Sequence, residues 1–257
     1  MDKQRVHEPA RDVEIIESAD VVVVGGGPGG IPAAVAAARA GAKTVVIERY
    51  GILGGLATTC LMGPLFGYAP FGYFDFHQAG SENLLGGIPV EIVRRLQQIG
   101  GAPDDNAIDW QAVKFDPELF KFVADDIVEE SGAIILLHAY TVNTIVEDRK
   151  IKAVVIESKS GRQAVTGKVF IDATGDGDVA FFSGCSYAKG READGAMLAF
   201  GSRFRIGGLR PRTPEEKQQC IDLSKEVIAS DEVHMLSASD FEECGSSVRP
   251  NESTPDI

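Results

Sequence analysis

The stretch VVVVGGGPGGIPAA, Val21–Ala34, decides how this chain folds. Four valines lead into six residues that are all glycine except Pro28, and a run rich in alanine follows. The mainly apolar run from Ala19 to Val24 is typical of a strand buried on both faces of a parallel sheet. The segment AAVAAARAG then predicts a helix that ends at Gly41. The glycines therefore lie in a turn between a strand and a helix.

A second apolar stretch, KTVVIE at 43–48, predicts another buried strand. A strand, a turn, a helix and a strand thus follow one another at the spacing of a βαβ crossover. Gly25, Gly27 and Gly30 give G-x-G-x-x-G inside this unit, and the second strand ends in Glu48. This is the context that the dinucleotide-binding fingerprint requires. A turn with a purely structural role is the alternative.

Each part of the fingerprint has a physical task. Gly25 permits the tight turn, Gly27 lets a pyrophosphate approach the backbone, and Gly30 allows close packing of helix on strand. The helix N-terminus carries partial positive charge toward the phosphates. Glu48 accepts hydrogen bonds from an adenosine ribose and would repel a 2′-phosphate. The loop residues expected to line the cofactor are Gly25, Gly27, Pro28, Gly29 and Gly30.

Composition excludes several classes of partner. The chain has 257 residues, 44% hydrophobic and 25% charged, with a net charge of −13. We expect no nucleic-acid partner and no membrane partner, because polyanions and anionic surfaces repel such a chain. No apolar stretch reaches membrane-spanning length, and the first residues lack the apolar segment of a signal peptide, so we expect a cytoplasmic protein.

The four cysteines are far apart and form no C-x-x-C pair. We therefore expect reduced, mostly structural thiols and no metal site.

Two later motifs bear on which cofactor is bound. LGG, Leu53–Gly55, follows the second strand, and DATGDGD, Asp172–Asp178, follows the last strand of a predicted strand-and-meander region at 133–172. Both offer bare backbone that can lie along a ligand. A domain that binds NAD alone would continue directly into a third strand. This chain instead inserts a long loop rich in glycine and aromatic residues, and then the meander.

Three further segments have clear local signals. FDPELFKFVADDIVEESG predicts a helix capped by Asp116, with Pro117 at its first position. AIILLHAYTVNTIVE predicts one strand. TPEEKQQCIDLSKEVIAS predicts a helix that begins with a capping box of Thr213 and Glu216.

Taken in order, VVVVGGGPGG, ERYGILGG and VFIDATGDGDVA resemble the FAD-dependent oxidoreductases of the glutathione-reductase-type fold. The resemblance runs from about Glu8 to Gly195. It implies an α/β fold with an FAD/NAD(P)-binding Rossmann-like domain: a parallel sheet with crossover helices and a small antiparallel β-meander. It also implies that FAD is bound in an extended form. The implied FAD contacts are Gly25, Gly27, Pro28, Gly29, Gly30, Glu48, Arg49, Gly54, Gly55, Thr58, Thr141, Thr174, Gly175 and Asp176, with Thr141 near the adenine.

The resemblance also suggests a division of the chain. We expect an N-terminal arm at 1–18 and a discontinuous FAD-binding domain at 19–60 and 112–183. A loop-and-helix insertion occupies 61–111, and the beginning of a substrate domain occupies 184–257. Full members of the family are longer, so we expect a truncated member or one piece of a larger flavoprotein. The missing C-terminal part is then one expected partner, and a second electron acceptor is another.

One motif of the family is absent. Disulfide reductases of this fold carry C-x-x-x-x-C after the second glycine pair, whereas LATTCLMGP here has Cys60 alone. This excludes a dithiol relay, and we expect Cys60 to pack in the interior.

The best candidate for a catalytic proton acceptor is His77, in the aromatic loop. A loop histidine bonded to a neighbour is the alternative. The surrounding aromatic residues either wall a substrate pocket or pack in the core. We expect no role for the other histidines. Solvated charges are expected at Arg94, Arg95, Arg203 and Arg205, with contact between one of them and an anionic substrate as the alternative.

The sequence thus predicts an FAD-dependent oxidoreductase that takes a hydride from a small organic molecule. Two alternatives stay open: a non-redox biosynthetic enzyme of the thiazole-synthase type on the same fold, and a dinucleotide-binding subunit without catalysis. The substrate cannot be named, because variable parts of such enzymes form the pocket.

Overall fold

A computed structural model describes residues 7, 9–62, 64–66, 86–103, 112–197 and 213–229. The chain divides into two compact units, Met1–Arg203 and Phe204–Ile257. Within the described ranges, no helix is both long enough and apolar enough to cross a membrane.

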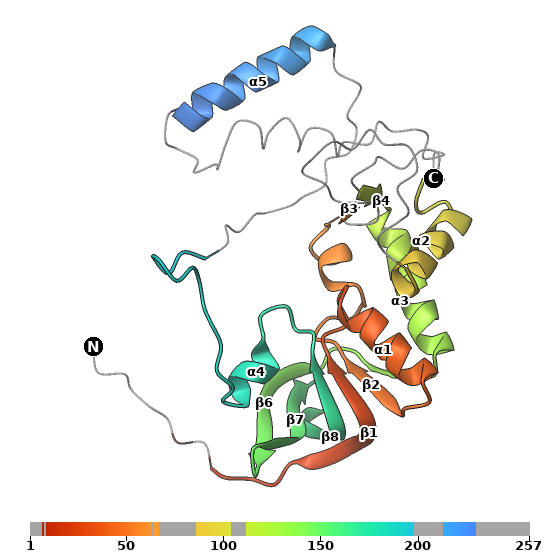
Figure 1. Cartoon of the computed structure of the whole chain (residues 1–257), viewed down its shortest axis with the longest axis vertical. Helices are drawn as coiled ribbons and strands as arrows, with labels where there is room; N and C mark the ends of the chain where they lie inside the picture. The colour runs from red at the N-terminus through yellow and green to blue at the C-terminus, as the bar shows by residue number, and fades with distance from the viewer. Residues whose placement is uncertain are drawn as a thin grey trace. The chain divides into compact units, whose positions relative to one another are not determined.

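The first unit is built on a six-stranded sheet with the order β5-β2-β1-β8-β7-β6 (Figure 1). Neighbours from β5 to β8 pair in parallel, and β8, β7 and β6 pair antiparallel. The strands are β1 (Glu14–Val24), β2 (Thr44–Ile47), β5 (Ile134–Leu136), β6 (Tyr140–Glu147), β7 (Lys150–Ser158) and β8 (Gly161–Asp172). The expected α/β fold, with a mainly parallel sheet and a small antiparallel meander, is confirmed.

The helices of this unit are α1 (Gly30–Arg39), α2 (Ile88–Gln98), α3 (Pro117–Glu130) and α4 (Asp178–Phe182). A short 3-10 turn η1 (Gly55–Ala57) follows β2, and β3 (Pro64–Phe66) pairs antiparallel with β4 (Ala112–Lys114). The start of α3 has the predicted form, because Asp116 accepts a hydrogen bond of 2.7 Å from the Glu118 N–H and Pro117 begins the helix. This cap satisfies one of the N–H groups that every helix start leaves open.

Apolar residues on the two faces of the sheet form two separate cores. On one face, Val23 and Val46 pack against α1, α2 and α3, which lie together in Figure 1. On the other face, the alternating residues Val22 and Val45 share a cluster with β7 and α4. Val165 of β8, the strand between β1 and β7, belongs to the same cluster. Burial on both faces explains the unbroken valines of β1.

Two strand predictions need correction. β1 begins at Glu14 rather than near Ala19, because β8 is long enough to pair with it from Gln163 onward. AIILLHAYTVNTIVE is two strands, β5 and β6, rather than one. The break falls at His138, where φ is +54°. There the His138 N–H donates to the Tyr50 carbonyl and the Ala139 N–H to the Glu48 carbonyl, both at 3.0 Å. The pair β3–β4 was not predicted, because three-residue strands carry no periodic signal.

The described part of the second unit is α5 (Pro214–Ala229). Its predicted capping box is confirmed. The Thr213 N–H donates to the Glu216 carboxylate at 2.9 Å, and the Glu216 N–H donates to the Thr213 hydroxyl at 3.3 Å.

An ion network joins the three helices of the first core. Glu91 of α2 accepts two hydrogen bonds from Arg39 of α1, at 2.6 and 2.8 Å, and it also pairs with Arg95 one turn along. Arg95 reaches Glu130 of α3 at 2.7 Å. Arg95 is therefore a paired residue, not the solvated charge expected from the sequence. Hydrogen bonds from Arg39, opposed by burial and supported by Arg95, lower the pKa of Glu91 from 4.5 to about 2.

The charge on Glu91 gives a pH-dependent contribution to stability. A carboxyl whose folded-state pKa lies below its unfolded value stabilises the fold above the unfolded pKa, and this stability is lost as the pH falls. We expect Glu91→Gln to lower the free energy of unfolding at pH 7 by about 1 kcal/mol, because the network is partly exposed. The variant should also show a shallower loss of stability between pH 4.5 and pH 2. Urea unfolding across this range measures both effects.

Glu129→Gln is the control, because Glu129 is an exposed carboxylate of α3 that forms no ion pair among the described residues. Equal losses in the two variants would contradict a specific role for the network.

Candidate cofactor site

The glycine loop is closely packed on its inner side. Gly25 follows β1 with φ +103°, and its N–H donates to the Ile47 carbonyl at 2.7 Å. A Cβ at Gly25 would lie 2.2 Å from the Ala173 carbonyl oxygen, and one at Gly30 only 1.7 Å from the Gly25 carbonyl oxygen. Real Cβ atoms do not approach backbone so closely. The turn and the packing of helix on strand therefore require glycine at both positions.

The outer side of the loop is open. A Cβ at Gly29 would meet no atom within 4 Å, and one at Gly27 would meet only the Gly55 Cα at 3.9 Å. Gly29 is the N-cap of α1 and offers no side-chain cap. The first N–H groups of a helix have no acceptor inside the helix, and they attract anions. The loop therefore has the shape and polarity of a phosphate cradle.

The LGG motif lies against this loop. The Gly54 N–H donates to the Gly26 carbonyl at 2.8 Å, and a Cβ at Gly55 would be 3.0 Å from the Gly27 Cα. Thr58 holds the motif in place, because its buried hydroxyl donates to the Leu53 carbonyl at 2.8 Å. The same side chain occupies the space that a Cβ at Gly54 would need. The two glycine motifs thus form one surface.

Glu48 also holds the loop in place. Its carboxylate is 4% exposed and accepts hydrogen bonds from the Gly26 N–H at 2.7 Å and the Tyr50 N–H at 2.9 Å. Each carboxylate oxygen has a second acceptor position that these two hydrogen bonds leave unused. Sequence reasoning missed Gly26. A Cβ there would lie 2.4 Å from Leu53 Cδ2, and the unbroken run of three glycines was the available signal.

DATGDGD begins beside the same loop. Asp172 ends β8 in register with Val24 of β1, and the Ala173 N–H donates to the Val24 carbonyl at 2.8 Å. Gly175 and Asp176 are exposed, and a Cβ at Gly175 would meet nothing within 4 Å. The structure therefore brings all three motifs to the edge where the parallel strands β1, β2 and β8 end. Ligands of open α/β sheets bind at this edge.

Negative charge gathers around DATGDGD. Partial burial, followed by the charges of Asp176 and Asp172, raises the pKa of Asp178, and Arg49 opposes this shift. Arg49 is exposed, with its guanidinium carbon 4.9 Å from the centroid of the Tyr50 ring. Arg49 therefore lies close enough to Asp178 to affect its charge, and it connects the end of β2 to the third motif.

Thr141 lies on β6, two residues after Ala139, whose N–H donates to the Glu48 carbonyl. It is 9% exposed, and its hydroxyl oxygen is a buried polar atom without a hydrogen-bond partner in the part of the chain that the structure describes. Its contact with an adenine stays a prediction.

Other predicted residues lie outside the described ranges or differ from expectation. His77 and most of the aromatic loop fall within 67–85, outside the described residues. Cys60 and Cys185 are exposed, so the expectation that Cys60 packs in the interior is wrong. Across the described ranges, no group of three or more His, Cys, Asp or Glu side chains forms a metal site.

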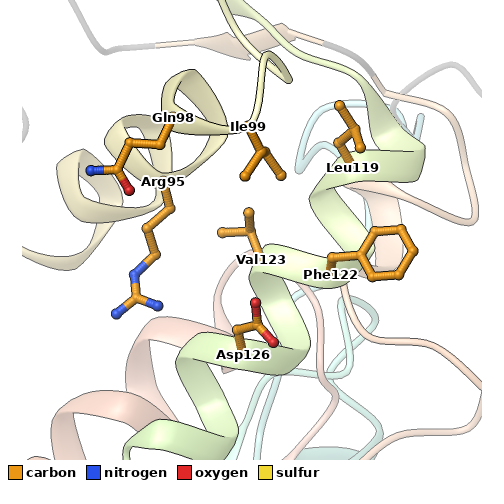
Figure 2. A pocket seen from close by; sticks show the side chains of 7 residues that line it. All are labelled: Arg95, Gln98, Ile99, Leu119, Phe122, Val123 and Asp126. Atoms are coloured by element: carbon orange, nitrogen blue, oxygen red, sulfur yellow. The ribbon is translucent and has the colours of Figure 1, made fainter.

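A groove of about 440 Å³ lies elsewhere, between α2 and α3 (Figure 2). Its lining is mainly apolar, with Arg95 and Asp126 on one side. None of the predicted cofactor residues lines it, so it does not compete with the glycine cradle. The lining residues are Arg95, Gln98, Ile99, Leu119, Phe122, Val123 and Asp126.

Comparison with known proteins agrees with this geometry. The model of the FAD dependent oxidoreductase family matches residues 20–250. The chain belongs to this family, and FAD is its cofactor.

Curated relatives match over shorter stretches. Dihydrolipoyl dehydrogenase of Trypanosoma brucei brucei is 45% identical over 84 residues, which are 31% of this chain and 17% of that protein. Leghemoglobin reductase of Glycine max is 62% identical over 42 residues, 16% of this chain and 8% of that protein. The chain thus matches less than a fifth of the length of either relative.

Solved structures resemble the chain more loosely. A geranylgeranyl bacteriochlorophyll reductase-like protein of Thermoplasma acidophilum is 20% identical, with a TM-score of 0.44 over 65% of this chain and 42% of that one. Thermovibrio ammonificans THI4 is 18% identical, with a TM-score of 0.45 over 64% and 61%. Likenesses at this level do not distinguish one activity from another.

The contrast between Gly30 and Gly29 gives a matched test of the cradle. We expect Gly30→Ala to destabilise the FAD-free protein by about 3 kcal/mol or more, because its Cβ would clash with fixed backbone. The higher helix propensity of alanine offsets less than about 1 kcal/mol of this destabilisation. Gly29→Ala, whose Cβ enters open space, should stay within about 0.5 kcal/mol of wild type. Urea unfolding measures the free energy of unfolding of both variants, and equal values would contradict the packing described for Gly30.

Proposed function

We propose that the protein is an FAD-dependent oxidoreductase that accepts a hydride from a small organic substrate, with a second acceptor later reoxidising the flavin. The observation that carries this proposal is the meeting of three ligand-facing motifs at one edge of the sheet. A single glycine loop would suit many nucleotides. The LGG and DATGDGD segments extend the open surface in the manner that a long dinucleotide needs.

The roles of the residues follow from their environment. In this proposal, the open side of Gly27–Gly30 and the N-terminus of α1 hold the pyrophosphate. Glu48 accepts hydrogen bonds from the adenosine ribose with its remaining lone pairs. Gly54, Gly55 and the exposed Gly175–Asp176 segment line the rest of the cofactor. FAD supplies the electron-accepting ring, and the protein supplies binding and orientation. His77 remains the proposed proton acceptor on the basis of residue type and loop position.

One purification tests the proposal. The protein should carry the visible absorption of an oxidised flavin and release a ligand with the mass of FAD. FAD added to ligand-free protein should raise its melting temperature, because a ligand that binds the native state stabilises it. If NAD or ADP stabilises the protein and saturating FAD does not, the proposed cofactor use is wrong.

The same sample separates the two alternatives from an oxidoreductase. Anaerobic addition of candidate alcohols, amines or hydroxy acids should bleach the flavin absorption for at least one class. A flavin that stays oxidised with every class, while dithionite reduces it, would favour a non-redox enzyme or a cofactor-binding subunit.

Glu48 provides a test of the adenosine end. We expect Glu48→Ala to weaken FAD binding by about 10- to 100-fold, since both the ribose contact and the anchors of the Gly26 and Tyr50 N–H groups are lost. Titration followed by flavin fluorescence gives the Kd. Glu147→Ala, at an exposed position of β6, is the control and should bind like wild type. Wild-type affinity in Glu48→Ala would contradict the role given to Glu48.

A further inference from the structure

The hydroxyl of Thr174 has no hydrogen-bonding capacity left for a ligand. It donates to Asp172 Oδ1 at 2.7 Å. It accepts from the Gly177 N–H at 3.1 Å and from the Asp178 N–H at 3.0 Å. A hydroxyl has one donor and two acceptor positions, so these three bonds fill it. The Thr174 hydroxyl therefore has no bonding position left for the cofactor, and a contact between FAD and the backbone of Thr174 stays a prediction.

Asp172 completes this arrangement, whereas the sequence suggested only that the acids of DATGDGD bond ligand hydroxyls. Its Oδ1 accepts from both the hydroxyl and the N–H of Thr174, the latter at 3.2 Å. Its Oδ2 accepts from the Ala180 N–H of α4 at 2.9 Å. The carboxylate thus ties the end of β8 to the first turn of α4. We call the pair Asp172 and Thr174, with these five hydrogen bonds, the Asp172–Thr174 clasp.

The clasp is directly coupled to the glycine loop. Ala173 lies between its two members, and the backbone of Ala173 is what a Cβ at Gly25 would meet at 2.2 Å. A Cβ at Gly30 would come within 3.3 Å of the Ala173 side chain. Ala173 therefore joins the two members of the clasp and also forms part of the surface against which the phosphate loop packs.

We propose that Asp172 and Thr174 are positioning residues that fix the DATGDGD loop before the cofactor arrives, leaving Gly175 and Asp176 as its ligand-facing part. The inference rests on the proposed use of FAD and deepens it. A preformed loop lowers the ordering cost of binding, so loss of the clasp weakens FAD binding without removing any atom that touches FAD.

Two substitutions of Thr174 test the inference. Thr174→Val keeps the shape but removes the hydroxyl, and Thr174→Ser keeps the hydroxyl. The first readout is amide hydrogen exchange in FAD-free protein over residues 174–182, and the second is the Kd for FAD. We expect Thr174→Val to speed exchange of the Gly177 and Asp178 amides and to raise the Kd, each by about tenfold. Thr174→Ser should restore both to within about twofold of wild type.

A matched control and a double mutant test whether the effect is specific to the clasp. Thr144 is a buried threonine of β6 whose hydroxyl shares a hydrogen bond of 3.4 Å with Ser183, at the other end of α4. Thr144→Val should leave the Kd for FAD unchanged. Asp172→Ala combined with Thr174→Val should raise the Kd no further than the stronger single change, because both remove the same clasp.

Each remaining outcome overturns the proposal in a distinct way. A raised Kd in Thr174→Val with wild-type exchange in the FAD-free protein would make Thr174 a direct ligand. Faster exchange with an unchanged Kd would make the clasp structural only. If wild-type protein binds no FAD, the proposed function fails and the positioning role falls with it, even where the exchange rates reveal the clasp.

Discussion

The arrangement of the cofactor site depends on close contact between the glycine loop and the backbone that follows β8. The end of β8 passes so near Gly25 that no side chain fits between them, and the Gly25 carbonyl lies equally close to Gly30. These contacts fix where β1 stops, where α1 begins and how far apart β1 and β8 lie. Every ligand-facing group at this edge takes its position from them, including the Gly54–Gly55 turn that packs on Gly27.

An acidic protein with a net charge of −13 is an unexpected host for a doubly charged pyrophosphate. The distances between the charged groups and the phosphate site explain how such a chain binds an anion. Attraction comes from backbone N–H groups at the start of α1, which act over a few ångströms, whereas solvent and salt screen the remote carboxylates. The nearby Glu48 carboxylate is already bonded to two N–H groups, which compensates its charge locally. Local dipoles therefore outweigh the overall charge.

Sequence reasoning captured what depends on local rules. The βαβ unit, the Asp116 cap and the Thr213 capping box follow from propensity and short-range hydrogen bonding. It missed what depends on contacts between distant segments. Asp172 was read as an acid of a ligand-facing loop, because its partner on α4 becomes visible only when the loop is folded. The split between β5 and β6 was missed for a similar reason, since Glu48 and Tyr50 hold the backbone around His138.

The long strand β8 has a consequence for how the chain folds. β8 pairs directly with β1, on the side opposite β2. The hydroxyls of Ser18 and Thr166, which are 148 residues apart in sequence, form a hydrogen bond of 2.7 Å across these two strands. During synthesis, one edge of β1 stays unpaired until the meander and β8 have been synthesised. Topologies with such distant pairing fold slowly, and unpaired edges invite aggregation. The charged residues Glu14, Glu17 and Asp20 lie along β1. Their charges disfavour pairing of the open edge with another chain before β8 is in place.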